Sequence, residues 1–267
     1  MTGLSYTVSG DPYRPTVLFL HGFMGSSADW AVAISALDRR FYCVAPDLPG
    51  HGTSLGLPPE AYTVEGAARG VLDLLDRLGA GRPTIVGYSM GGRLALYLAL
   101  RHPERCSGLF LESASPGIED ATEREARRRS DEERAERLEA GDLASFLHDW
   151  YRQPLFASLA RREGLVQEII EARMRNDPVE LACSLRGMGT GLQPSLWDDL
   201  DALQVPVVAV AGELDEKYAR ISRRITGSSP NARAVVVPGA GHNTRLEAPE
   251  AYLALLKRSL GDPDAGF

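Results

Sequence analysis

The chain alternates between short apolar runs and longer amphipathic segments. The apolar runs are Thr16–Leu20, Phe41–Ala45, Pro83–Val86, Gly108–Leu111, Val205–Ala211 and Arg233–Val237. Strands that are apolar on both faces are typical of a parallel sheet covered by helices. Helical periodicity occupies most of the gaps between them, in Ala28–Leu37, Val64–Leu78, Met90–Arg101, Tyr218–Ile225 and Pro249–Leu260. The pattern predicts an α/β fold with a mostly parallel, doubly wound sheet, to which Leu4–Ser9 adds an antiparallel edge strand.

The alternation stops between residues 113 and 203, where no strand pattern occurs. The segment Glu119–Ala140 is dense in Glu and Arg, which indicates a solvated helix face. Apolar stripes with a 3.6-residue period follow at Leu143, Phe146, Leu147 and Trp150, at Leu165, Ile169, Ile170 and Met174, and at Val179, Leu181 and Leu185. We therefore expect residues 113–203 to form an inserted helical cap, and residues 1–112 and 204–267 to form the core. Ligands of open α/β sheets bind at the carboxyl ends of the strands, so such a cap would cover the site.

Composition restricts the partners. The chain has 267 residues, of which 44% are hydrophobic and 24% charged, as in ordinary globular proteins. Its net charge of −7 argues against a nucleic-acid partner. The same charge would repel an anionic substrate unless arginines gather at the site.

Cysteines and the N-terminal segment bear on the compartment. Cys43, Cys106 and Cys183 are odd in number and widely spaced, which indicates reduced structural thiols rather than a disulfide framework or a metal site. The first residues carry no pattern of a secretory signal, and no run is long and apolar enough to span a membrane. We expect a cytoplasmic protein with no membrane partner.

The most informative motif is Gly87-Tyr88-Ser89-Met90-Gly91, which lies between a predicted strand and a predicted helix. Strand, G-x-S-x-G and helix together make a nucleophile elbow, a sharp turn that raises a serine hydroxyl above the sheet. The glycines let the strand and the helix approach closely. The motif predicts a catalytic Ser89. The alternative is a glycine-rich turn that merely packs a helix on a sheet.

A nucleophilic serine needs a base and a group that orients the base. In α/β-hydrolases these follow in the order serine, acid, histidine. Asp215 stands directly after the run Val205–Ala211; Glu213 competes with it, and we prefer Asp215. His242 lies in the loop after the last predicted strand, which is the expected place of the histidine.

Two backbone amides are candidates for an oxyanion hole. His21-Gly22-Phe23-Met24-Gly25 follows the first long strand and resembles the loop that supplies one such amide, here that of Phe23. The second would be the amide of Met90, directly after the serine. We expect His21 to be structural, and likewise Asp47 and His51 in the next turn-rich loop.

Arg93 stands one helical turn after Ser89, on the same face. It is either a surface arginine whose stem packs on the helix or a cation that awaits a carboxylate. The spacing leaves both open.

The layout of these residues resembles the α/β-hydrolase superfamily over essentially the whole chain. Within it, the run Asp149-Trp150-Tyr151-Arg152-Gln153-Pro154-Leu155-Phe156-Ala157-Ser158-Leu159 resembles one branch, as do Gly189–Trp197 and Gly87–Arg93. That branch is the 2-succinyl-6-hydroxy-2,4-cyclohexadiene-1-carboxylate synthases of menaquinone and phylloquinone biosynthesis.

The resemblance implies a lyase that eliminates pyruvate from a substrate with three carboxylates. It implies that Ser89, His242 and Asp215 abstract a proton α to the succinyl ketone, while the amides of Phe23 and Met90 hold the enolate oxygen. Sequence does not separate Ser89 from His242 as the immediate base.

Substrate-binding residues are also implied by the resemblance: Tyr88, Arg93, Arg127, Trp150 and Arg173. Arg128 or Arg129 could replace Arg127, and Arg175 could replace Arg173. No cofactor and no metal are expected, and the oligomeric state stays open, a monomer included. Alternative functions are a serine hydrolase of small esters or C–C bonds, and a non-enzymatic, ligand-binding relative.

Overall fold

The computed structural model describes residues 3–162 and 164–262. Its sheet has the strand order β1-β3-β2-β4-β5-β6-β7. The strands are β1 (Tyr6–Ser9), β2 (Thr16–Leu20), β3 (Tyr42–Pro46), β4 (Thr84–Tyr88), β5 (Gly108–Glu112), β6 (Val207–Gly212) and β7 (Ala232–Val237). β1 pairs with β3 antiparallel, whereas the other neighbours pair in parallel. The predicted α/β sheet with its antiparallel edge strand is confirmed.

The helices alternate with these strands. They are α1 (Ala31–Leu37), α2 (Val64–Leu78), α3 (Met90–Arg101), α4 (Ala121–Glu139), α5 (Leu143–Tyr151), α6 (Leu165–Arg173), α7 (Pro178–Met188), α8 (Glu216–Ser228), α9 (Thr244–Glu247) and α10 (Pro249–Ser259). Short 3₁₀ helices are η1 (Ser27–Trp30), η2 (Pro59–Tyr62), η3 (Pro103–Arg105), η4 (Pro154–Phe156), η5 (Leu159–Arg161) and η6 (Trp197–Ala202).

Two helix predictions needed correction, and one helix was missed. The segment predicted as a helix from Ala28 begins as the 3₁₀ helix η1 and becomes α-helical only at Ala31. α8 begins at Glu216, two residues before the predicted start, because the Asp215 carboxylate accepts the amide N–H of Tyr218 and caps the helix. The short helix α9 was not predicted, since four residues are too few to show a period.

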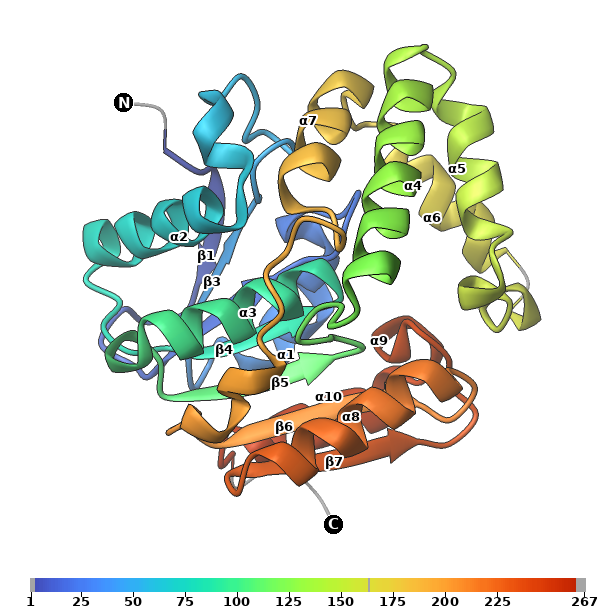
Figure 1. Cartoon of the computed structure of the whole chain (residues 1–267). Coiled ribbons are helices and arrows are strands. Elements are labelled where there is room, and N and C mark those ends of the chain that lie inside the picture. Colours follow the sequence, from blue (N-terminus) through green and yellow to red (C-terminus); the bar gives the residue numbers. More distant parts are fainter. Residues whose placement is uncertain (1–2, 163, 263–267) are drawn as a thin grey trace.

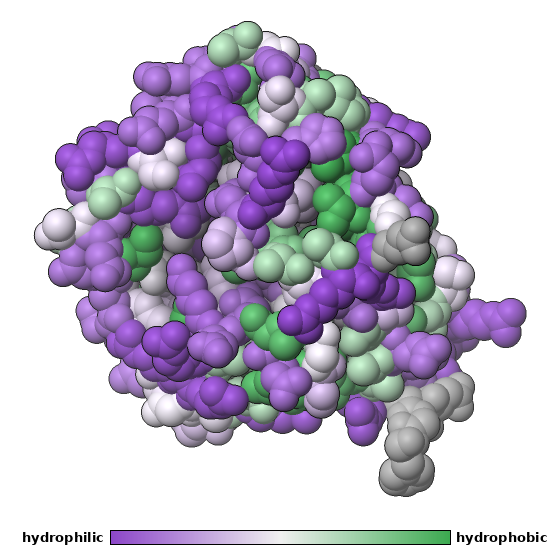
Figure 2. Space-filling model, turned by 90° about the vertical axis from the view of Figure 1, so that its right-hand side faces the viewer, coloured by the Kyte–Doolittle hydropathy of each residue, from purple (hydrophilic) through white to green (hydrophobic). Residues whose placement is uncertain are grey.

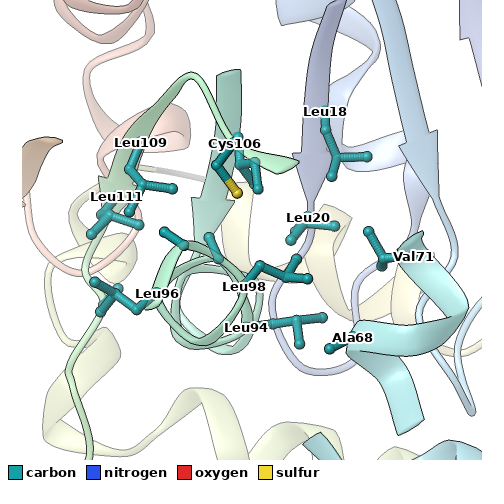
Figure 3. Close-up of a cluster of buried hydrophobic side chains, with 14 of the residues drawn as sticks. Leu18, Leu20, Ala68, Val71, Leu94, Leu96, Leu98, Cys106, Leu109 and Leu111 are labelled. Atoms are coloured by element: carbon teal, nitrogen blue, oxygen red, sulfur yellow. The ribbon is translucent and has the colours of Figure 1, made fainter. Parts of the chain in front are cut away.

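Helices cover both faces of the sheet (Figure 1). Along β2 the side chains alternate: Leu18 and Leu20 face α2 and α3, whereas Val17 and Phe19 face α1 and α10. Figure 3 shows the first of these layers, with Leu18 and Leu20 directed toward the leucines of α3. Leu20 is fully buried, and truncating such a side chain to alanine costs about 2–5 kcal/mol. These two layers hold the sheet, and with it the loops at the strand ends.

Between β5 and β6 the described chain is helical, and α4 to α7 lie beyond the carboxyl ends of the strands (Figure 1). A separate cluster of buried apolar side chains holds these helices together; it includes Leu138, Phe146, Ile170 and Leu181. Met174 and Val179, which we placed in apolar stripes, are 45% and 51% exposed, because they lie on the outer side of this cluster.

The boundaries of the cap stay a prediction. Leu196, Leu200 and Leu203 belong to the 113–203 segment, yet they pack into the cluster that faces α2 and α3. Residues 1–2, 163 and 263–267 of the predicted core and cap lie outside the described residues.

Figure 2 shows the face that lies on the right-hand side of Figure 1; hydrophilic residues dominate it, and hydrophobic ones form small separate groups. Among the helices of residues 3–162 and 164–262, none is long and apolar enough to cross a membrane. Cys43 and Cys106 are buried, and burial raises the pKa of each thiol to about 12.

Candidate active site

Ser89 occupies the turn between β4 and α3, with φ 47° and ψ −106°. A positive φ is strained for a residue with a side chain, and such strain gathers at functional sites. The flanking glycines are required by close approach: a Cβ on Gly91 would lie 2.1 Å from the Leu20 carbonyl oxygen, and one on Gly87 would lie 2.6 Å from the Cα of Gly92. The turn therefore holds the serine where β2, β4 and α3 converge.

The structure brings Ser89, His242 and Asp215 together, although they lie far apart in the sequence. His242 Nε2 is 3.4 Å from Ser89 Oγ, and His242 Nδ1 is 2.6 Å from Asp215 Oδ2. Because the short contact to a carboxylate places the proton on Nδ1, Nε2 is left as an acceptor for the serine hydroxyl. His242 and Asp215 are 2% and 6% exposed, so bulk water competes little for these bonds.

Asp215 and its competitor Glu213 follow the same strand but have different partners. The second oxygen of Asp215, Oδ1, accepts the amide N–H of Tyr218 at 3.2 Å, which fixes the carboxylate against His242. The Glu213 side chain is exposed and accepts the amide N–H of Gly239 at 3.0 Å. Asp215 is thus the carboxylate bonded to His242.

Phe23 and Met90 line the same cavity as Ser89. As the first residue of α3, Met90 has an amide N–H with no acceptor inside the helix. The Phe23 loop is held from behind by His21, whose Nε2 accepts the amide N–H of Leu48 at 2.9 Å. His21 and His51 form a buried histidine pair with ring centres 5.0 Å apart, as expected for structural residues.

The cavity lies between the strand ends and the cap and has a volume of about 560 Å³. All five predicted substrate-binding residues line it, in company with Ser89, Asp215 and His242. Its basic lining residues are Arg93, Arg127, Arg134, Arg173 and Lys217, and its acidic ones are Asp29, Asp215 and Glu216. Basic residues therefore gather at the one place where an anionic substrate of this acidic protein would need them.

Arg93 is half-buried and lines the cavity. Its guanidinium donates to Gln193 Oε1 at 2.8 Å and to the Met188 carbonyl oxygen at 2.9 Å. Burial, with a smaller contribution from the charge of Arg127, lowers the pKa of Arg93 to about 10. Both partners are neutral, so a carboxylate in the cavity would meet an uncompensated cation.

Of the three consecutive arginines of α4, Arg127 to Arg129, only Arg127 lines the cavity. Arg127 Nε donates to Asp131 Oδ1 at 2.7 Å and the side chain lines the cavity. Arg128 instead pairs with Glu125 on the exposed side of the helix, and Arg129 is also exposed.

Arg173 is buried and makes two bonds of 2.7 Å to the carboxylate of Asp29, whereas Arg175 is exposed. Burial alone would lower the pKa of Arg173, but the Asp29 carboxylate raises it above its ordinary value. Arg173 is thus a lining cation that already has a counter-ion.

Tyr88 and Trp150 form aromatic walls. The Trp150 ring lies 5.4 Å from that of Phe23 and 5.8 Å from that of Phe146, centre to centre. Burial raises the pKa of Tyr88 well above its ordinary value, so its phenol stays neutral and able to donate a hydrogen bond.

Sequence reasoning missed several lining residues: Arg134, Tyr151, Lys217 and Tyr218. Arg134 stands seven residues after Arg127, two helical turns on, and donates to the same Asp131 oxygen at 3.2 Å. The i, i+7 spacing could have revealed it. The ring centres of Tyr218 and His242 lie 4.7 Å apart. The two residues belong to different segments, so no local sequence pattern predicts this contact.

The described residues contain no group of three or more His, Cys, Asp or Glu side chains arranged to hold a metal ion.

The fold and the site define an α/β hydrolase: the family model for the alpha/beta hydrolase fold matches residues 15–249. A Bacillus subtilis (strain 168) relative is 37% identical over 94% of this chain and 92% of its own. The 2-succinyl-6-hydroxy-2,4-cyclohexadiene-1-carboxylate synthase of Serratia proteamaculans (strain 568) is 35% identical over 95% of this chain and 96% of its own. The solved structure of MenH from S. aureus superposes with a TM-score of 0.91, at 31% identity, covering 98% of this chain and 99% of that one. The chain belongs to the 2-succinyl-6-hydroxy-2,4-cyclohexadiene-1-carboxylate synthase family.

Proposed function

We propose that this protein is the lyase that eliminates pyruvate from 2-succinyl-5-enolpyruvyl-6-hydroxy-3-cyclohexene-1-carboxylate. The product is 2-succinyl-6-hydroxy-2,4-cyclohexadiene-1-carboxylate. The observation that carries the proposal is a single cavity that holds both the Ser89–His242 pair and four arginines. Family membership supports the same conclusion. A pathway enzyme of this kind would act in the cytoplasm.

In the proposed reaction, the Ser89–His242 pair removes the proton from ring carbon 2, next to the succinyl ketone. The electrons of that C–H bond form the new C2=C3 double bond, and the former C3=C4 double bond becomes C4=C5. The C5–O bond breaks, and the leaving group departs with the electron pair as the enolate of pyruvate, which then takes up a proton. No acyl-enzyme and no cofactor are needed. Asp215 holds the Nδ1–H tautomer of His242, which keeps Nε2 free to receive a proton.

Charge develops on the succinyl ketone oxygen as the proton leaves. Phe23 and Met90 line the same cavity as Ser89, and their amides would donate to this oxygen. Preorganised donors of this kind are worth about 3–4 kcal/mol each in acyl-transfer enzymes, because they need no reorientation during the reaction.

The substrate's three carboxylates require cations. The guanidinium groups of Arg93 and Arg127 have N–H donors left over for a ligand beyond the bonds to Gln193 and Asp131, and Arg173 is a third cation in the cavity. Forked guanidinium groups suit carboxylates because two parallel hydrogen bonds can form. Tyr88 and Trp150 would hold the ring between them.

The test follows pyruvate release and diene absorbance together, on freshly generated substrate. Wild-type protein should produce both at equal rates, well above the spontaneous elimination. Ser89→Ala should lower kcat by about a thousandfold or more. Ser145→Ala, at an exposed serine on the cap helix α5, is the matched control and should behave as wild type. Activity on simple esters with no accelerated pyruvate release would instead indicate a hydrolase, and a Ser89→Ala variant with near-normal turnover would contradict the mechanism.

A further inference from the structure

Glu112, the last residue of β5, is a fully buried carboxyl group with no role in the chemistry described above. Burial raises its pKa, since the charged form is costly away from water. Basic or polar partners offset part of this cost. The main chain and the side chain of Glu112 both bond to segments of the active site.

The main chain of Glu112 holds the serine turn. Its carbonyl oxygen accepts the amide N–H of Ser89 at 2.9 Å, directly beside the register pair Tyr88–Glu112 of β4 and β5. The backbone of the strained turn is therefore tied to the end of the neighbouring strand.

The side chain of Glu112 holds the histidine loop. Its Oε1 accepts the hydroxyl of Thr244 at 2.7 Å and the amide N–H of Arg245 at 2.8 Å. Thr244 and Arg245 are the first residues of α9, directly after the loop that carries His242. Donors at the start of a helix lack acceptors within it, and here a carboxyl group from another strand satisfies one of them.

Arg245 connects this group to the surrounding core. Its Nε lies 3.9 Å from Glu112 Oε2, and its Nη1 donates to the Asp29 carbonyl oxygen at 2.6 Å. The guanidinium also lies over the rings of Trp30 and Tyr88, 4.8 Å and 5.5 Å from their centres. The start of α9 is consequently fixed from several sides.

We propose that Glu112 is the positioning residue of the Ser89–His242 pair. It holds the serine turn through its main chain and the histidine loop through its side chain, and so sets the separation of Ser89 Oγ and His242 Nε2. The inference rests on the proposed function, in which these two atoms share a proton. A misplacement of about 1 Å can cost about 100-fold in rate.

Three variants test this role: Glu112→Ala, Glu112→Gln and Thr244→Val. Because Oε1 accepts both bonds, the amide oxygen of glutamine can replace it, whereas alanine leaves Thr244 and Arg245 without their acceptor. Thr244→Val removes one bond and keeps the carboxyl group. Glu104→Ala, at an exposed glutamate before the other end of β5, is the control.

Two readouts are measured: kcat and KM for pyruvate release, and the rate at which a fluorophosphonate probe labels Ser89. The labelling rate depends on the Ser89–His242 geometry but not on the natural substrate. Glu112→Ala should lower both kcat and the labelling rate by about 10- to 100-fold, with KM changed less than threefold. Glu112→Gln should restore both to within about threefold of wild type, and Thr244→Val should lie between. Far-UV circular dichroism checks that each variant is folded.

The proposal would be overturned if folded Glu112→Ala had the same labelling rate and kcat as the wild type. It would also be overturned if Glu112→Gln were as slow as the alanine variant. If Glu112→Ala fails to fold, Thr244→Val decides: a slower labelling rate at unchanged KM supports the proposal, and an unchanged rate overturns it. A wild type that is labelled but releases no pyruvate would overturn the proposed function alone, and the labelling rates would still decide about Glu112. A wild type that is not labelled and releases no pyruvate would overturn both.

Discussion

Replacing Asp215 by asparagine should reverse the proton arrangement of His242. Asp215 Oδ1 accepts the amide N–H of Tyr218, and Oδ2 faces His242 Nδ1 at 2.6 Å. An asparagine at this position keeps its amide oxygen on the Tyr218 N–H, because an NH₂ group there would face another donor. The NH₂ group then points at His242 Nδ1, which must become an acceptor. The proton moves to Nε2, where it blocks acceptance of a proton from Ser89 or from the substrate.

The expected loss is about 10⁴-fold in kcat, the cost of the wrong tautomer in serine enzymes. At 1.36 kcal/mol for each factor of ten, this is about 5.4 kcal/mol of transition-state stabilisation. The fold should survive, because asparagine caps helices about as well as aspartate does, and the cap of α8 is retained. We therefore expect the free energy of unfolding to change by no more than about 1–2 kcal/mol.

The assay couples released pyruvate to lactate dehydrogenase, with urea unfolding of each variant measured in parallel. Glu213→Gln is the matched control, since it makes the same chemical change two residues away, at an exposed carboxylate that contacts Gly239 rather than His242. It should stay within about threefold of wild type. A folded Asp215→Asn variant that keeps more than a tenth of wild-type kcat would refute the tautomer argument.

Further tests address the cavity charge and the buried histidines. Arg127→Met should raise KM at least about tenfold through the loss of a charged hydrogen bond, whereas Arg128→Met, outside the cavity, should leave KM unchanged; equal effects in the two variants would contradict the assignment. Burial holds the pKa of His51 well below its ordinary value, so below about pH 6.5 the unfolded chain binds a proton that the folded chain does not. Stability contributed by neutral His51 is thus present above pH 6.5 and is lost on acidification, by up to about 1.4 kcal/mol per pH unit, until the lowered pKa is reached. Urea unfolding of wild type and His51→Phe between pH 8 and pH 5 should show a steeper loss in the wild type, and parallel curves would refute this.

Elements with local signals could be predicted closely from the sequence. The bounds of α2, Val64–Leu78, were predicted without error because its signals are local: Thr63 accepts the amide N–H of Gly66 at the start, and Gly79 adopts a left-handed conformation at the end. The start of α3 at Met90 follows directly from the G-x-S-x-G motif. Asp215 and His242 could be proposed because each follows a strand whose carboxyl end must reach the same edge of the sheet.

Residues whose role depends on contacts between distant segments could not be predicted. Glu112 meets Thr244 across 132 residues of sequence, and as the last residue of an apolar strand it carries no local sign of that contact. Arg93 is a similar case, since its guanidinium donates to Gln193, 100 residues later. The i, i+4 spacing from Ser89 placed Arg93 on the correct face of the helix, but no spacing within the helix shows what covers that face.

The charge distribution explains how an acidic protein can take a substrate with three carboxylates. The net charge of −7 belongs mainly to exposed groups, and salt screens them beyond about 8–10 Å. Inside the cavity, basic lining residues outnumber acidic ones, and two of the acidic ones, Asp29 and Asp215, are already bonded to Arg173 and His242. Desolvation lowers the pKa of Arg93, whose two hydrogen-bond partners, Gln193 and the Met188 carbonyl, carry no charge. A carboxylate bound beside Arg93 would supply the counter-ion that these hydrogen-bond partners lack, as expected of a preorganised site.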